Sequence, residues 1–169
     1  MSRVFNLRMA RQTAEAFLKR EGITSLPVDP FAIAEKLDIM VEGKPEGVDG
    51  VSGMLLRHGN DFGIIYATNI SSRGFQRFSV SHEIGHYMLP GHPEHVIKDG
   101  IHVSRAGFVT NDLYELEADH FAAGLLMPVA LVRAAWAGTT GEVHRRILQC
   151  ADKFQVSGQA AYYRLKILD

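Results

Sequence analysis

Residues 79–89 read SVSHEIGHYML, and the interpretation of the whole chain starts from this stretch. It lies inside a segment of helical periodicity that begins near Arg73 and ends at Pro90. His82 and His86 are four residues apart, so on a helix they lie about 40° apart around the axis and one turn along it. The sequence therefore predicts that these two imidazoles bind one metal ion.

The chemistry of this pair favours Zn2+ as the cofactor. Zinc accepts imidazole ligands, and hydrolytic zinc sites combine three protein ligands with a water molecule. Glu83 follows the first histidine and can take the proton of that water and pass it to a leaving amine, so we predict a catalytic role for it. The small Gly85 leaves room for a neighbouring strand or a substrate to approach.

The third ligand has two candidates from the residues alone, and the first is His92. It lies six residues after His86, which matches the HExxHxxGxxH spacing except that Leu89 occupies the glycine position. Pro90 and Gly91 can still turn the chain, so this alternative stays open.

The second candidate lies on another predicted helix, residues 112–127. Glu115 and Asp119 share a face of this helix, so Glu115 can bind the metal while Asp119 accepts the free ring N–H of a ligand histidine. Glu117 is the rival, but it lies about 200° away around the helix and is expected to face solvent. A solvated acidic face is the ordinary alternative for such a run of acids.

The remaining segments predict an α+β fold in one domain over residues 1–169. Apolar spacing and capping residues predict further helices over residues 7–21, 30–37, 129–137, 140–154 and 157–168. A short strand at 39–41 and a hairpin of 54–56 with 62–67 predict a small antiparallel sheet on this helical body. Residues 91–110 lack clear periodicity and are expected to form a loop or a short irregular excursion.

Composition excludes several classes of function. The chain has 169 residues, is 46% hydrophobic and has a formal net charge of -1, so no basic field attracts nucleic acid. Cys150 is the only cysteine, which excludes an internal disulfide and a cysteine-cluster zinc site and fits a reducing compartment. No secretory signal precedes the first helix, and Pro128 and Arg133 interrupt the longest apolar stretch, so we expect a cytoplasmic protein without a membrane span.

Several segments together resemble the ImmA/IrrE-type zinc metallopeptidases, which are compact gluzincin-like HExxH peptidases. SVSHEIGHYML is followed by ELEADHFAAGLLMP at residues 115–128, and the family's second motif reads approximately E-x-x-A-(N or D)-x-F-A…L-L-M-P. The segments VDPFAIAEKLDI, GMLLRHGNDFGIIYA and FQVSGQAAYYRL are similar to the family's opening helix, hairpin and closing segment. The resemblance thus covers most of the chain.

The resemblance implies an α+β fold, zinc bound by His82, His86 and Glu115, and Glu83 as general base and acid. Members typically cleave a repressor, so the implied partner is a protein substrate, a helix-turn-helix repressor. Some members carry an attached helix-turn-helix or sensor domain, for which 169 residues leave no room. We therefore expect any regulation to come from another chain or from metal supply.

A substrate segment is expected to add in extended form to the exposed edge of the hairpin. The developing oxyanion needs a further donor. The candidates are Tyr87, Tyr114, Tyr162, Tyr163, His120 and Arg105. The other histidines are expected on the surface or in loops, with His95 and His102 at most near the cleft: His58, His95, His102 and His144.

Two other classes of function stay open. Residues 154–165 have the helix, turn, helix order of a DNA-reading motif, but the surrounding bases are partly offset by acids, so we expect no direct nucleic-acid binding. The bases are Arg145, Arg146, Lys153, Arg164 and Lys166. The other class is a repressor-binding regulatory module with a structural or silent zinc site, against which the intact HEIGH segment and the third acid argue.

Overall fold

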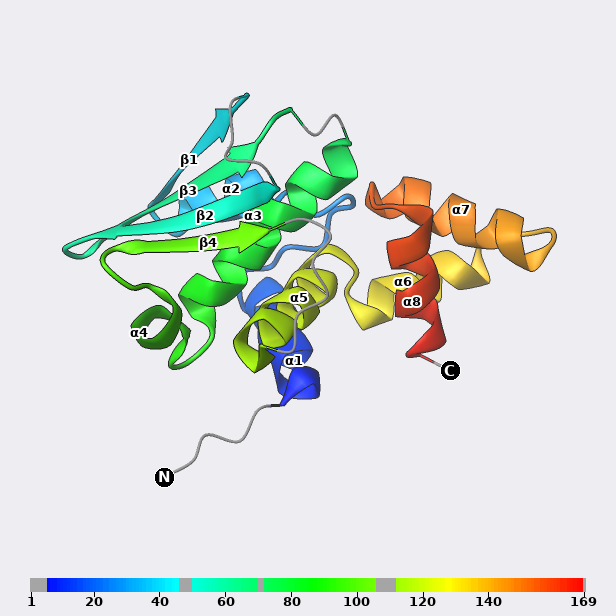
Figure 1. Ribbon diagram of the computed structural model, residues 1–169. Coiled ribbons are helices and arrows are strands. Elements are labelled where there is room, and N and C mark those ends of the chain that lie inside the picture. The colour runs from blue at the N-terminus through cyan, green and yellow to red at the C-terminus, as the bar shows by residue number, and fades with distance from the viewer. Residues whose placement is uncertain (1–5, 46–49, 70–71, 106–111, 169) are drawn as a thin grey trace.

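The computed structural model describes residues 6–45, 50–69, 72–105 and 112–168, so part of the glycine-rich segment before the predicted hairpin lies outside the described residues. Within these ranges eight helices accompany a small four-stranded sheet (Figure 1). The helices are α1 (Leu7–Arg20), α2 (Pro30–Lys36), α3 (Arg73–Met88), α4 (His92–Val96), α5 (Leu113–Leu126), α6 (Val129–Ala137), α7 (Val143–Phe154) and α8 (Gly158–Lys166). The strands are β1 (Ile39–Lys44), β2 (Val51–His58), β3 (Asp61–Ala67) and β4 (Ile101–Arg105).

The α+β class and the predicted helices are confirmed, with each helix end within three residues of its expected position. Side chains at the N-termini explain this agreement, because they accept a backbone N–H of the first turn. These capping residues are Asn6, Asp29, Ser72, Asp112 and Ser157. Pro30 occupies the first turn of α2, where its missing N–H is harmless.

The sheet has the order β1-β3-β2-β4 and is mixed. The predicted hairpin is confirmed, since β2 and β3 pair antiparallel from Gly53↔Tyr66 to His58↔Asp61. However, β1 pairs with β3 in parallel, in the register Ile39↔Phe62. The prediction of a purely antiparallel sheet was therefore wrong in this respect. The reason lies in the strand order. β3 lies between β1 and β2, so β1 pairs with β3, to which it is parallel, and does not pair with the antiparallel β2.

The expectation of a loop or irregular excursion over residues 91–110 was wrong where the structure describes them. This segment contains α4 and β4, and β4 pairs antiparallel with β2. The hairpin strands are thus interior, and the outer strands of the described sheet are β1 and β4 rather than a hairpin edge. Along β4 the inward residues are the polar His102 and Ser104, and the apolar Ile101 and Val103 face outward, so the short alternation of this strand does not have the usual apolar side toward the core.

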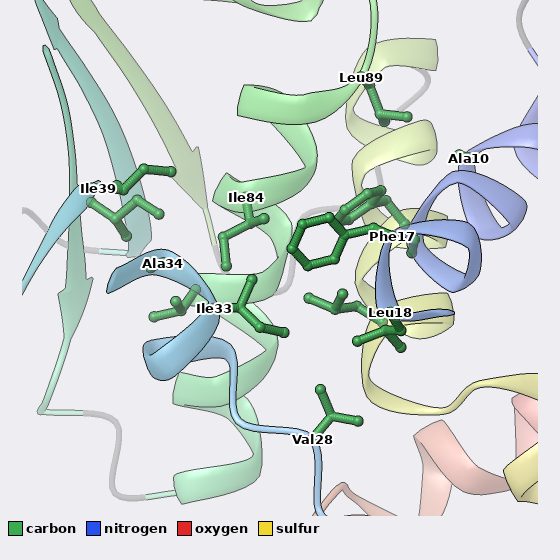
Figure 2. Packing of buried hydrophobic residues seen from close by; sticks show 14 of the residues in the cluster. Ala10, Phe17, Leu18, Val28, Ile33, Ala34, Ile39, Ile84 and Leu89 are labelled. Carbon is green, nitrogen blue, oxygen red and sulfur yellow. The ribbon is translucent and has the colours of Figure 1, made fainter. Parts of the chain in front are cut away.

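Two hydrophobic clusters hold the helices in place. In the first, Phe17 and Leu18 of α1 approach Ile33 of α2 and Ile84 of α3 beneath the sheet (Figure 2). The second joins the end of α5 to α6, α7 and α8 around Val132 and other residues. Helix α3 lies between the sheet and α5, which brings its central turns into the interior (Figure 1).

The second cluster includes the lone cysteine. Cys150 is 1% exposed and packs among apolar side chains, and burial raises the pKa of its thiol. Within the described ranges no single helix has both the length and the apolar character to cross a membrane. Helices α5 and α6 pass that test only as a pair, bent by 50° at their junction.

Candidate metal centre

Helix α3 presents its two histidines side by side in the interior. Every residue from Ser79 to His86 is buried. The Nε2 atoms of His82 and His86 lie 3.0 Å apart, as their spacing on one helical face predicts. Both imidazoles therefore direct the same ring nitrogen toward one point.

Helix α5 brings a carboxylate to that point. Glu115 lies in its first turn, with Oε2 at 3.3 Å from His82 Nε2 and Oε1 at 3.2 Å from His86 Nε2. The three residues that the resemblance implies as ligands thus lie together. Glu115 follows His86 by 29 residues in the sequence (115 − 86) and belongs to a different helix.

Close packing of α3 on α5 makes this approach possible. A Cβ atom at Gly85 would lie 3.1 Å from the Phe121 ring and 3.3 Å from Ala118 Cα, so even alanine is tight here. The neighbour that Gly85 accommodates is therefore another helix, and the expectation of a strand or a substrate at this position was wrong.

Asp119 orients the first histidine. Its Oδ1 lies 2.8 Å from His82 Nδ1, one helical turn after Glu115. A carboxylate accepts the Nδ1–H, so Nε2 carries the lone pair that faces the cluster. This is the geometry predicted for a residue that holds a ligand histidine.

His92 and Glu117 form a second orienting chain. His92 Nδ1 lies 3.0 Å from His86 Nδ1, and its Nε2 lies 3.1 Å from Glu117 Oε2. Glu117 also accepts the backbone N–H of Asn6 at 2.7 Å. Assigned along this chain, Glu117 accepts from His92, neutral His92 accepts from His86, and His86 Nε2 keeps its lone pair for the cluster.

These contacts correct one expectation and refine another. Glu117 was expected to face solvent, but it is 1% exposed, because α5 is covered by α1 on one side and α3 on the other. His92 is fully buried behind His86, and it lies outside the group of donors that can share one ion. The structure therefore places His92 behind His86 and not among the grouped donors, where the HExxHxxGxxH alternative required it.

Sequence reasoning placed His102 at most near the cleft and did not include it among the metal donors. Its Nε2 lies 3.2 Å from Glu115 Oε1, and among the described residues it joins His82, His86 and Glu115 in one group whose donor atoms all lie within 4.8 Å of one another. No motif could have identified it, because the strand that carries it was not expected. Its alternation with exposed Ile101 and Val103 was the only available signal.

Glu83 lies beside the cluster, against β2. A Cβ atom at Gly53 would lie 2.7 Å from Glu83 Oε1, so the carboxylate occupies the space of a missing side chain. Glu83 is fully buried, and neither carboxylate oxygen makes a hydrogen bond of normal geometry to the described residues, although the Ser104 hydroxyl is near enough to lower the pKa of Glu83 against the larger effect of burial. A buried acid without partners is costly, so this position calls for a bound donor such as water.

The charges of the site follow from these contacts. Burial alone would lower the pKa of His82, but hydrogen bonds to Asp119 and Glu115 raise it to about 10, so a bound metal would displace a proton from its Nε2. Burial lowers the pKa of His86 to about 3, and burial raises the pKa of Glu83. Hydrogen bonds to the three histidines lower the pKa of Glu115 against the effect of its own burial.

The donor set fits a zinc ion. Tetrahedral zinc with bonds of about 2.0–2.1 Å holds its ligand atoms about 3.3–3.4 Å apart. The four separations given above, which involve both Glu115 oxygens, run from 3.0 to 3.3 Å, and the donor atoms of His82, His86, His102 and Glu115 all lie within 4.8 Å of one another. Neutral imidazoles with an ionised carboxylate are also the ligands that zinc accepts, and the unpartnered Glu83 has the position of a proton acceptor beside them.

A largely apolar cavity of about 630 Å³ begins next to this centre. Asp119 and Phe78 belong to its wall, and the Phe78 ring lies 6.5 Å from that of His82. The remaining wall comes from α1, the start of α3, α5 and α8 with the residues just before it, including Phe75, Ala123 and Tyr163. The cavity is therefore continuous with the polar surroundings of the first histidine.

The predicted oxyanion donors are dispersed. Tyr114 packs against His92 and His95, with ring centroids at 5.0 and 3.8 Å. Tyr162 and Tyr163 are exposed on α8, and His120 contacts Arg11. None of these contacts selects one residue for the role.

The suspected DNA-reading segment corresponds to α7 and α8. Arg164 is 4% exposed and donates to Glu15 and to the Met127 carbonyl. The guanidinium of Arg146 lies 3.8 Å from the centre of the Trp136 ring. Two of the five bases therefore serve internal packing.

The fold and this donor set define an α+β protein with a candidate metal centre on an HEIGH helix. A family model described as the IrrE N-terminal-like domain, Peptidase M78, matches residues 34–166, so the chain belongs to this family. The match confirms the resemblance read from the sequence, and it supports a metallopeptidase role.

A solved structure described as a Mycobacterium tuberculosis transcriptional regulator has a similar fold. The TM-score is 0.62 at 16% identity, over 94% of this chain and 47% of that chain, so this chain spans about half of that protein's length. At this identity the likeness concerns the fold alone. A search of curated proteins gave no match.

Proposed function

We propose that this chain is a zinc-dependent endopeptidase that cleaves a regulatory protein, with His82, His86 and Glu115 as metal ligands and Glu83 as general base and acid. The observation that carries the proposal is the Glu83 carboxylate, fully buried and without a hydrogen-bond partner among the described residues, beside a cluster of zinc-type donors. A purely structural zinc site has no use for such a group.

The chain's own residues would divide the reaction between them. When bound, the zinc ion would polarise the scissile carbonyl and make an attacking water molecule more acidic. Glu83 would take the proton of that water on a free carboxylate oxygen and pass it to the leaving amine. Its low exposure excludes bulk water and favours the neutral acid after the transfer. Asp119 and the His92–Glu117 pair would keep the ligand histidines in register.

The substrate would bind along β4 rather than along the hairpin. β4 is an outer strand of the described sheet, and it carries His102 into the donor cluster. An extended segment paired with this strand would pass the metal centre. The apolar cavity beside Asp119 would then receive a large apolar side chain of the same segment.

A helix-turn-helix repressor is the substrate class that we propose within regulatory proteins. The family resemblance supports it, and the structural neighbour is itself named a transcriptional regulator. The test is to incubate the purified zinc protein with candidate repressors and to map new termini by mass spectrometry. Failure to cleave any repressor while cleaving unfolded casein would reject the repressor and keep the peptidase.

The variant Glu83→Gln tests the catalytic assignment. Because the amide cannot accept the proton, we expect kcat to fall by about 10²–10⁴-fold. Zinc content should equal that of the wild type, because Glu83 is not among the four grouped donors. Metal analysis and a cleavage assay measure both effects, and a variant that cleaves at the wild-type rate would contradict the assignment.

A further inference from the structure

The proposed function uses three ligands, which leaves a fourth donor of the same cluster without a role. His102 Nε2 lies 3.2 Å from Glu115 Oε1, and its ring centroid lies 4.3 Å from that of His86. We propose that His102 is a fourth protein ligand, which closes the coordination sphere in the resting protein and which a docking substrate displaces. This inference rests on the proposed peptidase function.

The strand directs His102 to the metal position. His102 is opposite Leu55 in the antiparallel pair of β2 and β4, and the side chain of Leu55 is fully buried on the inner face of the sheet. The neighbours Ile101 and Val103 are 49% and 38% exposed, so they face away from the centre. The inward position of His102 is therefore set by the register of the sheet.

His102 is also the ligand that is easiest to release. Its side chain is 12% exposed, against 8% for His82 and 0% for His86. The other three ligands belong to the two packed helices α3 and α5, whereas β4 pairs with a single strand in the described sheet. Ser104 Oγ lies 3.2 Å from the same Nε2 and offers it a hydrogen bond away from the metal.

The strand that would bind the substrate also carries His102, so substrate docking can displace this ligand. A centre with four protein ligands is typical of structural zinc, and a hydrolytic centre keeps one position open. An extended segment that pairs with β4 would move the backbone that carries His102, which would leave the vacated position to the attacking water beside Glu83 and bring the segment's own carbonyl to the centre. Docking and opening of the centre would thus be one event, and the resting protein would be latent.

The first experiment measures metal affinity and coordination. His102→Ala and His102→Gln should each bind Zn2+ at least about tenfold more weakly than wild type in competition with a chelator. The visible absorption bands of Co2+ bound to these variants should differ from those of the wild type. His58→Ala, which changes an exposed histidine at the end of β2, should match the wild type in both. Unchanged affinity and spectra in both His102 variants would overturn the inference.

The second experiment tests displacement with azide on the Co2+ protein. If His102 occupies the position nine-tenths of the time, azide should bind His102→Ala about tenfold more tightly than wild type. Equal azide affinities would overturn the inference. A wild-type protein that never takes azide, beside a variant that does, would make His102 a permanent ligand and would also overturn it.

Glu115→Ala in the same titrations separates this inference from the proposed function. Loss of metal in Glu115→Ala with wild-type affinity in both His102 variants rejects only the fourth ligand. Wild-type affinity in Glu115→Ala rejects the proposed metal centre itself. Circular dichroism of each variant establishes that it is folded.

Discussion

At the scale of single residues, the two α3 histidines of the candidate centre are each held by another side chain. Asp119 holds His82 directly, and Glu117 holds His86 through His92. Such support keeps an imidazole in one tautomer and one orientation, which costs less free energy on metal binding than ordering a free side chain. We therefore expect different consequences from losing a ligand and from losing its support.

Metal analysis of Glu115→Ala, His92→Ala and Glu117→Ala tests this difference. Glu115→Ala should lose zinc on dialysis, because it removes the donor nearest to all three histidines of the cluster. The other two variants should keep zinc with an affinity lower by about 10–100-fold, the usual effect of removing a group that holds a ligand. Retention of zinc by Glu115→Ala together with its loss from His92→Ala would restore the HExxHxxGxxH alternative.

Gly53 provides a second test at this scale, because it leaves space for the Glu83 carboxylate. A methyl group in Gly53→Ala would lie 2.7 Å from Glu83 Oε1 and push the carboxylate aside. We expect kcat to fall by up to about 10²-fold, since small misplacement of a reacting group is costly, while zinc content stays constant.

Gly63→Ala is the matched control for this variant. It makes the same change on the neighbouring strand β3, where the nearest atom, Met40 O, lies 3.7 Å away. Its kcat should stay near the wild-type value. Equal losses of kcat in both variants would show that the sheet, rather than Glu83, is sensitive to the added methyl group.

At the scale of elements, the centre depends on the close packing of α3 and α5 and on one edge strand. The same two helices and α8 enclose the apolar cavity, so the reaction centre and the proposed substrate pocket share their walls. A change in the pocket can therefore alter substrate binding without touching a metal ligand.

Ala123→Phe tests the pocket. Ala123 is half-buried on α5 and lines the cavity, so a phenyl ring there would fill part of the space proposed for an apolar substrate side chain. We expect kcat/KM to fall by about 10–200-fold, the range for losing an apolar contact in a pocket, with unchanged zinc content. Ala134→Phe places the same ring on an exposed face of α6 as a control. Equal kcat/KM in the two variants would contradict the pocket's role.

At the scale of the whole molecule, a polar contact joins the two hydrophobic clusters. Glu15 of α1 accepts a hydrogen bond from Arg164 of α8 at 2.6 Å and from the backbone N–H of Val129 at 3.1 Å. The carboxylate thus satisfies the start of α6, where Pro128 offers no side-chain cap. Arg164 also donates to the Met127 carbonyl at the end of α5. The end of α5 and the start of α6 are thus hydrogen-bonded to α8 and α1.

Arg164→Met should therefore lower the free energy of unfolding by about 1–3 kcal/mol, because it leaves the buried Met127 carbonyl without its donor and removes one of the two donors to the Glu15 carboxylate. Urea denaturation measures this value. In a double-mutant cycle with Glu15→Gln, the two changes should be non-additive by at least about 0.5 kcal/mol. Lys166→Met, at an exposed position of the same helix, should change stability by less than about 0.5 kcal/mol. Strict additivity would mean that the two residues act separately.

The sequence by itself determined the elements whose signals are local. Capping residues and helical spacing placed α1, α2, α3 and α5. The spacing of His82 and His86, together with the i, i+4 pair Glu115 and Asp119, predicted a candidate metal centre, and the fold brings these four residues together. These features depend on backbone geometry over one or two turns, which neighbouring residues dictate.

Only the tertiary structure decided the features that depend on pairing between distant segments. Three such features are the parallel register of β1 with β3, the pairing of β4 with β2 and the position of His102 next to Glu115. The inward residues of β4 are polar, so the sequence of this strand did not mark a side that faces the core. The burial of Glu117 arises in the same way, because a helix covered on two sides has no solvent face for its acid to occupy. Contacts between segments far apart in the chain are set by how whole surfaces fit together, and single-residue spacing carries no record of that fit.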